Sequence, residues 1–221
     1  MIGIILPSRG YIFTEVLESI ETMRKRWGIA LYMSHNLPVP QAFNELTKKA
    51  LNAGCSELLY VEEDTVPPLH IVEDMMKILE DDEKCGAVFC EYPLSNGQST
   101  VVYKEGTKKI LYGGLGCTMV PACVFADLKE PFFRSDLAFQ LTPYTEWKTV
   151  DPLKQYGLYD VHFFCMVRKK GYTIAKVDSI ARHLKVTKLG TPEVNGGIHL
   201  IEDKATTLVP SFIAVDPKEY F

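Results

Sequence analysis

Three consecutive acidic residues, Glu62, Glu63 and Asp64, directly follow the apolar run at residues 58–61. That run has the length and composition of a buried strand. Carboxylates at the carboxyl end of such a strand commonly hold a hard divalent cation beside a diphosphate, because Mg²⁺ and Mn²⁺ favour oxygen ligands. Acidic residues followed by threonine and proline also occur at helix starts. The triplet alone therefore supports two hypotheses, a metal site and a helix cap.

A second group of polar residues follows the first predicted strand. The apolar run at 2–6 ends in the turn Pro7-Ser8-Arg9-Gly10. Ligands of open parallel sheets bind at the carboxyl ends of the strands. The turn at 7–10, the turn at 34–36 and the acidic triplet are all expected on that edge. Arg9 is thus placed where a nucleotide could lie, although an ordinary surface turn would also accept an arginine.

The elements that must position these residues can be predicted from apolar periodicity. Short apolar runs predict strands, and apolar residues at helical spacing predict helices between them. The expected order is strand 2–6, helix from about 13 to 27, strand 29–33, extended segment 37–40, helix 41–52, strand 58–61, helix 71–79 and strand 87–90. Thr14 or the turn before it should cap the first helix. Alternating strands and helices imply a mainly parallel sheet with right-handed crossovers.

The second half of the chain is less regular. It predicts a hairpin with strands at 101–103 and 109–112, an apolar stretch at 117–125, a helix at 160–170, and strands at 172–177, 198–201 and 212–215. We therefore expect an α/β fold with a mainly parallel, Rossmann-related central sheet flanked by helices and a small antiparallel extension. No internal repeat or low-complexity linker divides the chain, so residues 1–221 are predicted to form a single domain.

Composition disfavours several classes of protein. The chain has 221 residues, of which 47% are hydrophobic and 24% charged, as in an ordinary globular protein. A net charge of -4 disfavours a surface built to neutralise nucleic-acid phosphates. The six cysteines form no C-x-x-C pair, so neither a zinc site nor a disulfide framework is indicated. The N-terminal apolar run is too short for a signal peptide or a membrane span, so a cytoplasmic protein without an integral membrane segment is expected.

Four segments occur in a recognisable order. They are residues 41–68, which contain Ala42-Phe43-Asn44 and the acidic triplet, then Gly113 to Phe125, Asp160 to Tyr172, and Asp178 to His183. Their order and spacing resemble family 2-like glycosyltransferases of the GT-A fold, over about residues 1–186. The resemblance implies a GT-A-like fold in which 1–95 bind a nucleotide-sugar and 96–186 form the acceptor and catalytic half. Residues 187–221 would then form a tail that could serve as a lid or an oligomer contact.

The resemblance assigns a role to several of the acidic residues and to one histidine. Asp64 corresponds to the metal-binding acid that ends the family's D-x-D motif, and Glu62 replaces its first acid. Asp160 corresponds to the general base, with Tyr159 in place of the acid that usually precedes it, and His183 corresponds to a further metal ligand. Ordinary alternatives remain open, because Asp160 could cap a helix and His183 could be a simple strand-end histidine.

Contacts to the donor are expected from the turn after the first strand, the second helix, the acidic triplet, the glycine-rich strand and the basic segment after His183. They are Pro7, Ser8, Arg9, Gln41, Asn44, Glu62, Glu63, Gly113, Gly114, Lys185 and Lys188. The two glycines could instead make a tight turn. The two lysines could be solvated rather than neutralise diphosphate oxygens.

The activity implied by the resemblance is transfer of a sugar from a nucleotide-sugar to an acceptor hydroxyl, with Mn²⁺ or Mg²⁺ as cofactor and Asp160 as the base of an inverting reaction. A retaining enzyme on the same fold stays open. UDP is the default from the family's frequency alone, because Ser34-His35-Asn36 stands where the family usually has acidic residues. The acceptor (glycan, lipid-linked sugar, protein or modified nucleic-acid base) and assembly as a homo-oligomer are left open.

Two other classes of protein are weighed against this one. A nucleotidyltransferase that makes nucleotide-sugars would share the parallel sheet and acidic ligands, but it should carry a glycine-rich, basic loop after the first strand. The turn at 7–10 has a single glycine. A non-catalytic nucleotide- or glycan-binding module would keep the acidic triplet without a working base, and loss of turnover on replacing Asp160 would distinguish it from an enzyme.

Overall fold

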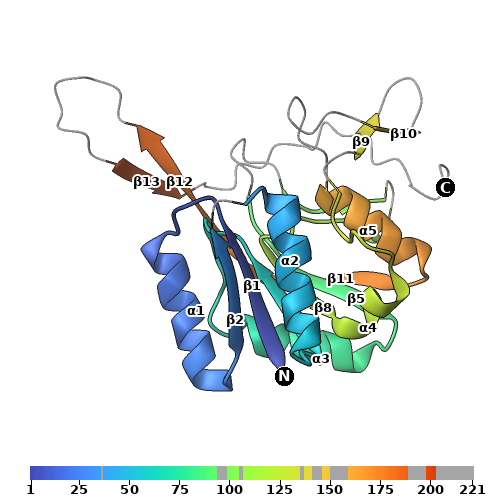
Figure 1. Ribbon diagram of the computed structural model, residues 1–221, viewed down its shortest axis with the longest axis horizontal. Coiled ribbons are helices and arrows are strands. Elements are labelled where there is room, and N and C mark those ends of the chain that lie inside the picture. Colours follow the sequence, from blue (N-terminus) through green and yellow to red (C-terminus); the bar gives the residue numbers. More distant parts are fainter. Residues whose placement is uncertain are drawn as a thin grey trace.

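The computed structural model describes residues 1–35, 37–93, 99–104, 107–134 and 159–184, and the strand backbone at 137–140, 146–149, 185–188 and 198–202. Its centre is a six-stranded sheet with the order β11-β5-β8-β3-β1-β2 (Figure 1). β1 pairs in parallel with β2 and β3, and β5 pairs in parallel with β11, whereas β8 is antiparallel to β3 and β5. The predicted mainly parallel sheet is thus confirmed. The strands are β1 (Ile2–Ser8), β2 (Ala30–His35), β3 (Glu57–Val61), β5 (Cys85–Glu91), β8 (Cys117–Pro121) and β11 (Thr173–Ile180).

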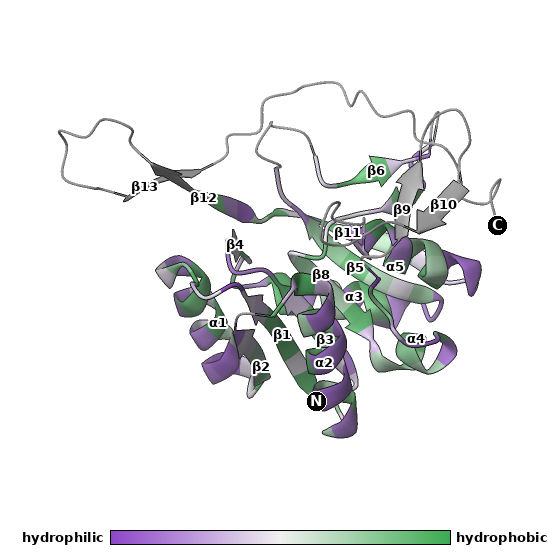
Figure 2. Cartoon of the chain, turned by 45° about the horizontal axis from the view of Figure 1, so that its top comes forward, coloured by the Kyte–Doolittle hydropathy of each residue, from purple (hydrophilic) through white to green (hydrophobic). Residues whose placement is uncertain are grey.

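Helices cover both faces of this sheet, because successive side chains of each buried strand point to opposite faces. Ile4 and Leu6 of β1 pack with the helices of one face, and Ile5 packs with those of the other. The first face carries α1 (Thr14–Trp27) and α3 (Ile71–Asp81), and the second carries α2 (Val39–Asn52), α4 (Ala122–Asp127) and α5 (Tyr159–Lys169). Hydrophobic residues accordingly gather on the central strands in Figure 2 and hydrophilic ones on the outer helix surfaces.

Two helix starts differ from the sequence-based expectation. Phe13 is the N-cap of α1, and no side chain makes a cap hydrogen bond there, so Thr14 is simply its first residue. Helix α2 begins at Val39, which makes the prediction of an extended segment wrong for Val39 and Pro40. A proline is compatible with the first turn of a helix, because the N–H that it lacks has no partner within the helix there.

Smaller antiparallel elements lie beside the main sheet. The expected hairpin is confirmed by β6 (Val102–Tyr103) and β7 (Ile110–Tyr112), which pair in antiparallel fashion. The pair β9 (Leu137–Gln140) and β10 (Glu146–Thr149) has no counterpart in the sequence-based prediction. The apolar stretch 117–125 divides into β8 and the start of α4, and the strand predicted at 212–215 lies outside the described residues.

A three-stranded sheet joins the acidic triplet to the end of the described chain. It has the order β13-β12-β4, formed by β4 (Thr65–Val66), β12 (Arg182–Lys188) and β13 (Ile198–Glu202). Strand β4 pairs with β12 so that Thr65 lies opposite His183. The main-chain N–H of Leu184 also donates to the carbonyl oxygen of Asp64 at 2.7 Å. This pairing fixes the backbone around the triplet against the backbone around His183.

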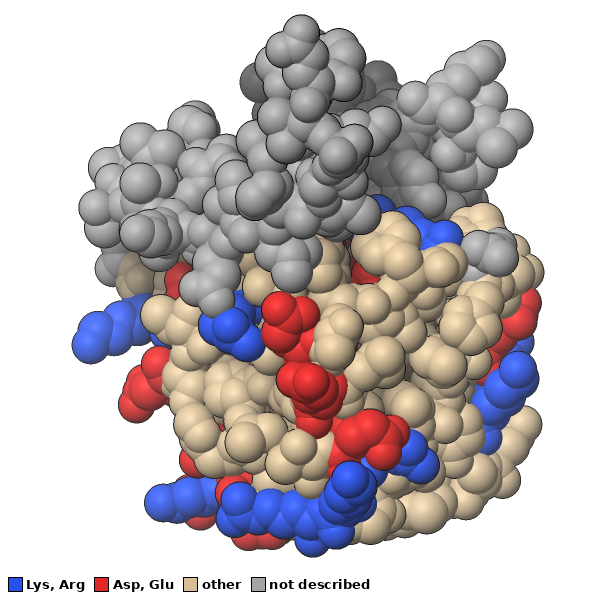
Figure 3. All heavy atoms as spheres, turned by 90° about the vertical axis from the view of Figure 1, so that its left-hand side faces the viewer, with Lys and Arg blue, Asp and Glu red and all other residues tan. Residues whose placement is uncertain are grey.

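The surface shows no separation of charge on the face seen in Figure 3, where acidic and basic side chains lie interspersed. Such a mixture fits the small net charge of -4. Within the described part of the chain, no helix combines the length and the apolar character needed to cross a membrane.

Candidate functional site

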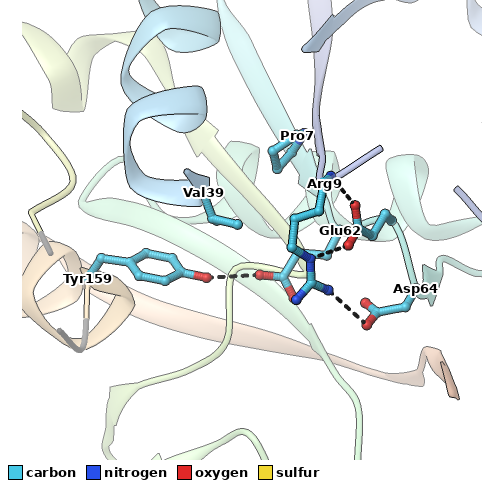
Figure 4. Close-up of a pocket in the computed structure, with 7 residues that line it drawn as sticks. Pro7, Arg9, Val39, Glu62, Asp64 and Tyr159 are labelled. Carbon is cyan, nitrogen blue, oxygen red and sulfur yellow. Dashed lines mark hydrogen bonds and ion pairs between the residues drawn. The ribbon is translucent and has the colours of Figure 1, made fainter. Parts of the chain in front are cut away.

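A pocket of about 320 Å³ opens at the carboxyl ends of β1 and β3 (Figure 4). This is the sheet edge on which the sequence places the turn at 7–10 and the acidic triplet. Its volume is at the lower end of the range for small-molecule sites, about 300–1,000 Å³. The residues that line it are Pro7, Arg9, Val39, Glu62, Glu63, Asp64 and Tyr159. All three members of the acidic triplet therefore reach one cavity.

Glu63 holds Arg9 in place through two hydrogen bonds. Its carboxylate is buried, with 3% of the residue exposed, and accepts a hydrogen bond from the main-chain N–H of Arg9 at 2.6 Å and another from Nε of the same residue. Burial lowers the pKa of Arg9, but the hydrogen bond and charge of Glu63 outweigh it, so that pKa is raised. The carbonyl of Glu63 accepts from the N–H of Phe13 at 3.1 Å. Glu63 thus organises the loop after β1.

Asp64 and His183 face each other across the β4–β12 pairing. The distance from Asp64 Oδ2 to His183 Nε2 is 3.4 Å. His183 Nδ1 lies 2.8 Å from the carbonyl oxygen of Pro93, which can only accept a hydrogen bond. Nδ1 therefore carries the proton, and in the neutral ring Nε2 presents a lone pair toward Asp64. Burial lowers the pKa of His183, but the hydrogen bond and charge of Asp64 outweigh it and raise the pKa.

This pair suits a divalent cation that keeps part of its shell for a substrate. Metal-ligating histidines commonly donate their other N–H to a carbonyl, as His183 does. Among the described residues, no group of three or more histidine, cysteine or acidic side chains is placed to hold a metal ion. Two protein ligands leave positions for water and phosphate oxygens, which Mg²⁺ and Mn²⁺ favour. The imidazole makes Mn²⁺ the better match of the two.

Glu62 is a buried carboxyl that two tyrosines hold. The hydroxyl of Tyr159 donates to its Oε1 at 3.2 Å, and the hydroxyl of Tyr92 lies 3.5 Å from its Oε2. Tyr92 also accepts the N–H of Gly116 at 3.0 Å, and its ring meets the ring of His183 edge to face, 5.4 Å between centroids. Burial and the nearby charges of Asp64 and Asp160 raise the pKa of Glu62 to about 7. No pattern in the sequence pointed to Tyr92 as a residue of the site.

The raised pKa of Glu62 predicts that ionisation of this buried carboxyl destabilises the fold as pH rises. The pKa rises from 4.5 in the unfolded chain to about 7 in the fold, so the folded state binds the proton more tightly. Stability of the metal-free protein should therefore fall as pH rises through this window, by up to about 3 kcal/mol. E62Q removes the titrating group and should be more stable than wild type at pH 8 but similar at pH 5, as measured by urea unfolding in EDTA. E45Q, on the exposed side of α2, should keep the wild-type dependence of stability on pH. An equally steep dependence in E62Q would contradict the assignment of this effect to Glu62.

Asp160 lies in the first turn of α5, directly after Tyr159. Its Oδ1 accepts the main-chain N–H of Val161 at 2.8 Å, so the carboxylate does make a helix-start hydrogen bond. Burial raises its pKa, and its charge is among the causes of the raised pKa values of Glu62 and Tyr159. Asp160 is thus electrostatically coupled to the pocket while, as the second residue of α5, it also accepts one N–H of the first turn.

Several residues expected to contact the donor make close contacts within the protein. Ser8 is buried, donates to the carbonyl of Tyr11 at 2.9 Å and accepts the N–H of Gly10 at 3.1 Å, which closes the turn. Gly113 and Gly114 are also buried: a Cβ would come within 2.8 Å of the Phe89 ring at the first and 2.3 Å of the Tyr92 hydroxyl at the second. A side chain at either glycine would collide with an aromatic ring, and neither glycine is among the residues that line the pocket.

The two amides of α2, Gln41 and Asn44, are not among the residues that line the pocket. Asn44 donates from Nδ2 to the carbonyls of Phe133 at 2.7 Å and Pro40 at 2.8 Å, and its Oδ1 accepts the N–H of Phe133 at 3.1 Å. These partners use both amide hydrogens, so Asn44 ties α2 to the segment at 133. Gln41 is exposed and pairs with Glu45 one helical turn away at 2.8 Å. These partners give both residues contacts within the protein, and their donor contacts stay predictions.

This difference predicts opposite outcomes for two neighbouring amides. N44A leaves the N–H and carbonyl of Phe133 without their partners and should destabilise the fold by about 2 kcal/mol, because unsatisfied buried polar groups are costly. Q41A removes only an exposed pair and should cost less than about 0.5 kcal/mol. Urea unfolding measures both. Equal stabilities of the two variants would rule out the bridge between α2 and Phe133.

The lysines predicted to contact the donor, Lys185 and Lys188, belong to β12, and their side chains lie outside the described residues. Pro7 and Arg9 remain at the pocket as expected. The site therefore retains Pro7, Arg9 and the acidic triplet from the predicted set, with His183 beside Asp64 and with Tyr159 and Tyr92 added.

Comparisons with known proteins bear on the fold. No protein-family model matches the chain, and no curated protein does. Among solved structures, A197 from STIV is similar, with a TM-score of 0.61 and 16% identity, covering 96% of this chain and 99% of that chain. At this identity the similarity concerns the fold alone, and A197 supports the α/β architecture over nearly the whole chain.

Two further solved structures have lower TM-scores. One is glucosyl-3-phosphoglycerate synthase from Mycobacterium tuberculosis in complex with Mn²⁺, UDP and glucosyl-3-phosphoglycerate, at 0.48 and 11% identity over 85% of this chain and 73% of that one. The other is a putative glucose-1-phosphate thymidylyltransferase from Bacillus anthracis, at 0.49 and 12% identity over 83% and 89%.

Proposed function

We propose that this chain is a metal-dependent glycosyltransferase that moves a sugar from a nucleotide-sugar to an acceptor hydroxyl, with a UDP-sugar as the default donor. The observation that supports this most is the meeting of Asp64 and His183, whose Oδ2 and Nε2 lie 3.4 Å apart beside Arg9. A carboxylate, an imidazole lone pair and a guanidinium at one sheet edge form a site for a cation and a diphosphate. Residues 1–95 would form the donor half and residues 96–186 the acceptor half.

Each polar group of the pocket has a distinct part in this proposal. When bound at Asp64 and His183, a divalent cation neutralises negative charge on the leaving diphosphate. Arg9 offers donors to the same phosphate oxygens. The hydroxyl hydrogen of Tyr159 is committed to Glu62, so both residues present acceptor atoms, which suits hydroxyl groups of a sugar.

Asp160 is the general base that accepts the proton of the acceptor hydroxyl. As the acceptor oxygen forms its bond to the anomeric carbon, the bond from that carbon to the diphosphate breaks and Asp160 takes the proton. The raised pKa of Asp160, caused by burial, makes the carboxylate a stronger base. Attack opposite to the leaving diphosphate gives inversion. The single glycine in the turn at 7–10 disfavours the nucleotidyltransferase alternative.

The direct test uses water as the acceptor, since the natural acceptor is undefined. Purified protein is incubated with UDP-, GDP-, CDP- and dTDP-sugars and Mn²⁺, and release of the nucleoside diphosphate is followed by chromatography. We expect slow release from one nucleotide class, abolished by EDTA. Release of inorganic diphosphate from a sugar 1-phosphate and a nucleoside triphosphate would instead identify a nucleotidyltransferase, and no turnover of any donor would contradict the proposal.

A further inference from the structure

Arg9 is held by one part of its side chain and leaves the other part directed at the pocket. Glu63 engages its main-chain N–H and Nε, and Glu63 is itself buried. The outer nitrogen Nη2 points to Asp64, 3.9 Å from Oδ2 (Figure 4). The side chain of Arg9 is 55% exposed, so its outer nitrogens can move without loss of the Glu63 anchor.

One oxygen of Asp64 lies near a nitrogen of Arg9 and a nitrogen of His183. Its Oδ2 lies 3.9 Å from Arg9 Nη2 and 3.4 Å from His183 Nε2. A divalent cation held by Asp64 and His183 would bind the electron pairs of Asp64 Oδ2, the oxygen that faces His183 Nε2. It would also place two positive charges beside the guanidinium, and like charges at such distances repel. The Arg9–Asp64 contact and a bound cation are therefore alternatives.

We propose that Arg9 is an exchangeable counter-ion. It pairs with Asp64 when no cation is bound; when a divalent cation takes Asp64, the outer nitrogens of Arg9 turn to the diphosphate while Glu63 keeps Nε. This inference rests on the proposed function for the identity of the anion, and on the described contacts for the exchange itself. It assigns Glu63 to positioning Arg9 rather than to touching the donor.

The exchange couples the binding of cation and nucleotide. Without nucleotide, Arg9 opposes the cation by competing for Asp64. With nucleotide, the phosphates supply a new anionic partner for Arg9, and the opposition is relieved. Coupling of this kind is reciprocal, so that Mn²⁺ must raise the affinity for the nucleotide by the same factor as the nucleotide raises the affinity for Mn²⁺.

The first test measures Mn²⁺ alone, by calorimetry on wild type, R9Q, R9K and R26Q. R9Q removes the competing charge and should bind Mn²⁺ about threefold to tenfold more tightly than wild type. R9K keeps a cation for buried Glu63, but one ammonium cannot span both carboxylates, so Mn²⁺ should again bind more tightly. Arg26 is a matched control, with a side chain 56% exposed and a 2.6 Å pair to Glu73, and R26Q should bind Mn²⁺ like wild type.

The second test measures UDP with and without Mn²⁺. In R9Q the loss of a charge-assisted contact should weaken UDP about tenfold to a hundredfold with Mn²⁺ present and much less without it. Unchanged Mn²⁺ affinity in R9Q and R9K, with Mn²⁺-dependent UDP binding intact in wild type, would overturn the exchange alone. If wild type binds Mn²⁺ more weakly than R9Q and R9K but binds no nucleotide, the proposed function is overturned. The competition between Arg9 and Mn²⁺ for Asp64 would still stand. Wild type that binds no Mn²⁺ would overturn both.

Discussion

Replacing Asp64 by asparagine (D64N) is expected to abolish the effect of Mn²⁺ on nucleotide binding and to lower donor turnover by about a thousandfold or more. Asp64 places its carboxylate Oδ2 3.4 Å from His183 Nε2. The amide keeps the size of the side chain but loses its negative charge, and a neutral oxygen binds a divalent cation weakly. Calorimetry with UDP and Mn²⁺, together with the rate of UDP release, measures both effects.

The chain offers a control pair with the same Oδ2–Nε2 distance. Asp74 and His70 also form an Oδ2–Nε2 pair at 3.4 Å, one turn apart on the exposed side of α3. D74N removes a carboxylate from a histidine without touching the pocket, and it should leave UDP binding, its Mn²⁺ dependence and turnover unchanged. If D64N and D74N behaved alike, the pair at Asp64 would have no special role.

The second large effect is expected from D160N, which should lower turnover about 10²- to 10⁴-fold with little change in UDP affinity. Asparagine can still accept the N–H of Val161 and so keeps the helix-start hydrogen bond, but it cannot take a proton from the acceptor. The loss is therefore expected in the rate of the chemical step. The rate is measured with Mn²⁺ at a saturating donor concentration. The affinity for UDP is measured separately, with Mn²⁺.

D160A separates the two roles of this carboxylate. It should show the same loss of turnover as D160N and, in addition, a loss of about 1 kcal/mol of stability, since alanine cannot accept the N–H of Val161 in the first turn of α5. Turnover close to wild type in D160N, with turnover lost in E62Q, would move the base from Asp160 to the carboxyl whose pKa is about 7. Turnover close to wild type in both variants would remove the proposed base altogether.

The central sheet could be predicted from the sequence because its strands are short and uniformly apolar. The run at 58–61 is buried on both faces, and the side chains after it necessarily emerge at the carboxyl edge. The same logic placed Pro7 and Arg9 at that edge. Helix α2 began earlier than predicted, because the preference of residues before proline for extended structure gave way to the tolerance of prolines in the first turn.

The partners inside the site could not be predicted in this way. Strand β4 has only two residues, too few for any periodicity, yet its pairing with β12 brings His183 to Asp64. Tyr92 follows β5 and reaches Glu62 only because Gly114 and Gly116 leave room for its ring. Such contacts depend on side-chain packing between distant segments, which local pattern does not encode.

The functions of polar side chains were the hardest part to predict. A sequence pattern cannot distinguish a carboxylate that faces a ligand from one that anchors a neighbouring loop. Glu63 and Asp64 are adjacent, but Glu63 is 3% exposed and is used by Arg9, whereas Asp64 faces His183 in the pocket. Asn44 likewise has a full set of backbone partners. Burial and hydrogen-bond geometry supply the distinction between these side chains that the sequence pattern lacks.

Calorimetric or thermal-shift titration of UDP, GDP, CDP and dTDP, each with and without Mn²⁺, tests the proposed donor site most directly. One nucleoside diphosphate, with UDP as the default, should bind at least about tenfold more tightly when Mn²⁺ is present, within the usual range of coupling between two ligands. The gain should disappear in D64N and persist in D74N. If no nucleoside diphosphate binds more tightly with the metal, a metal-assisted nucleotide-sugar site at Asp64 and His183 is contradicted.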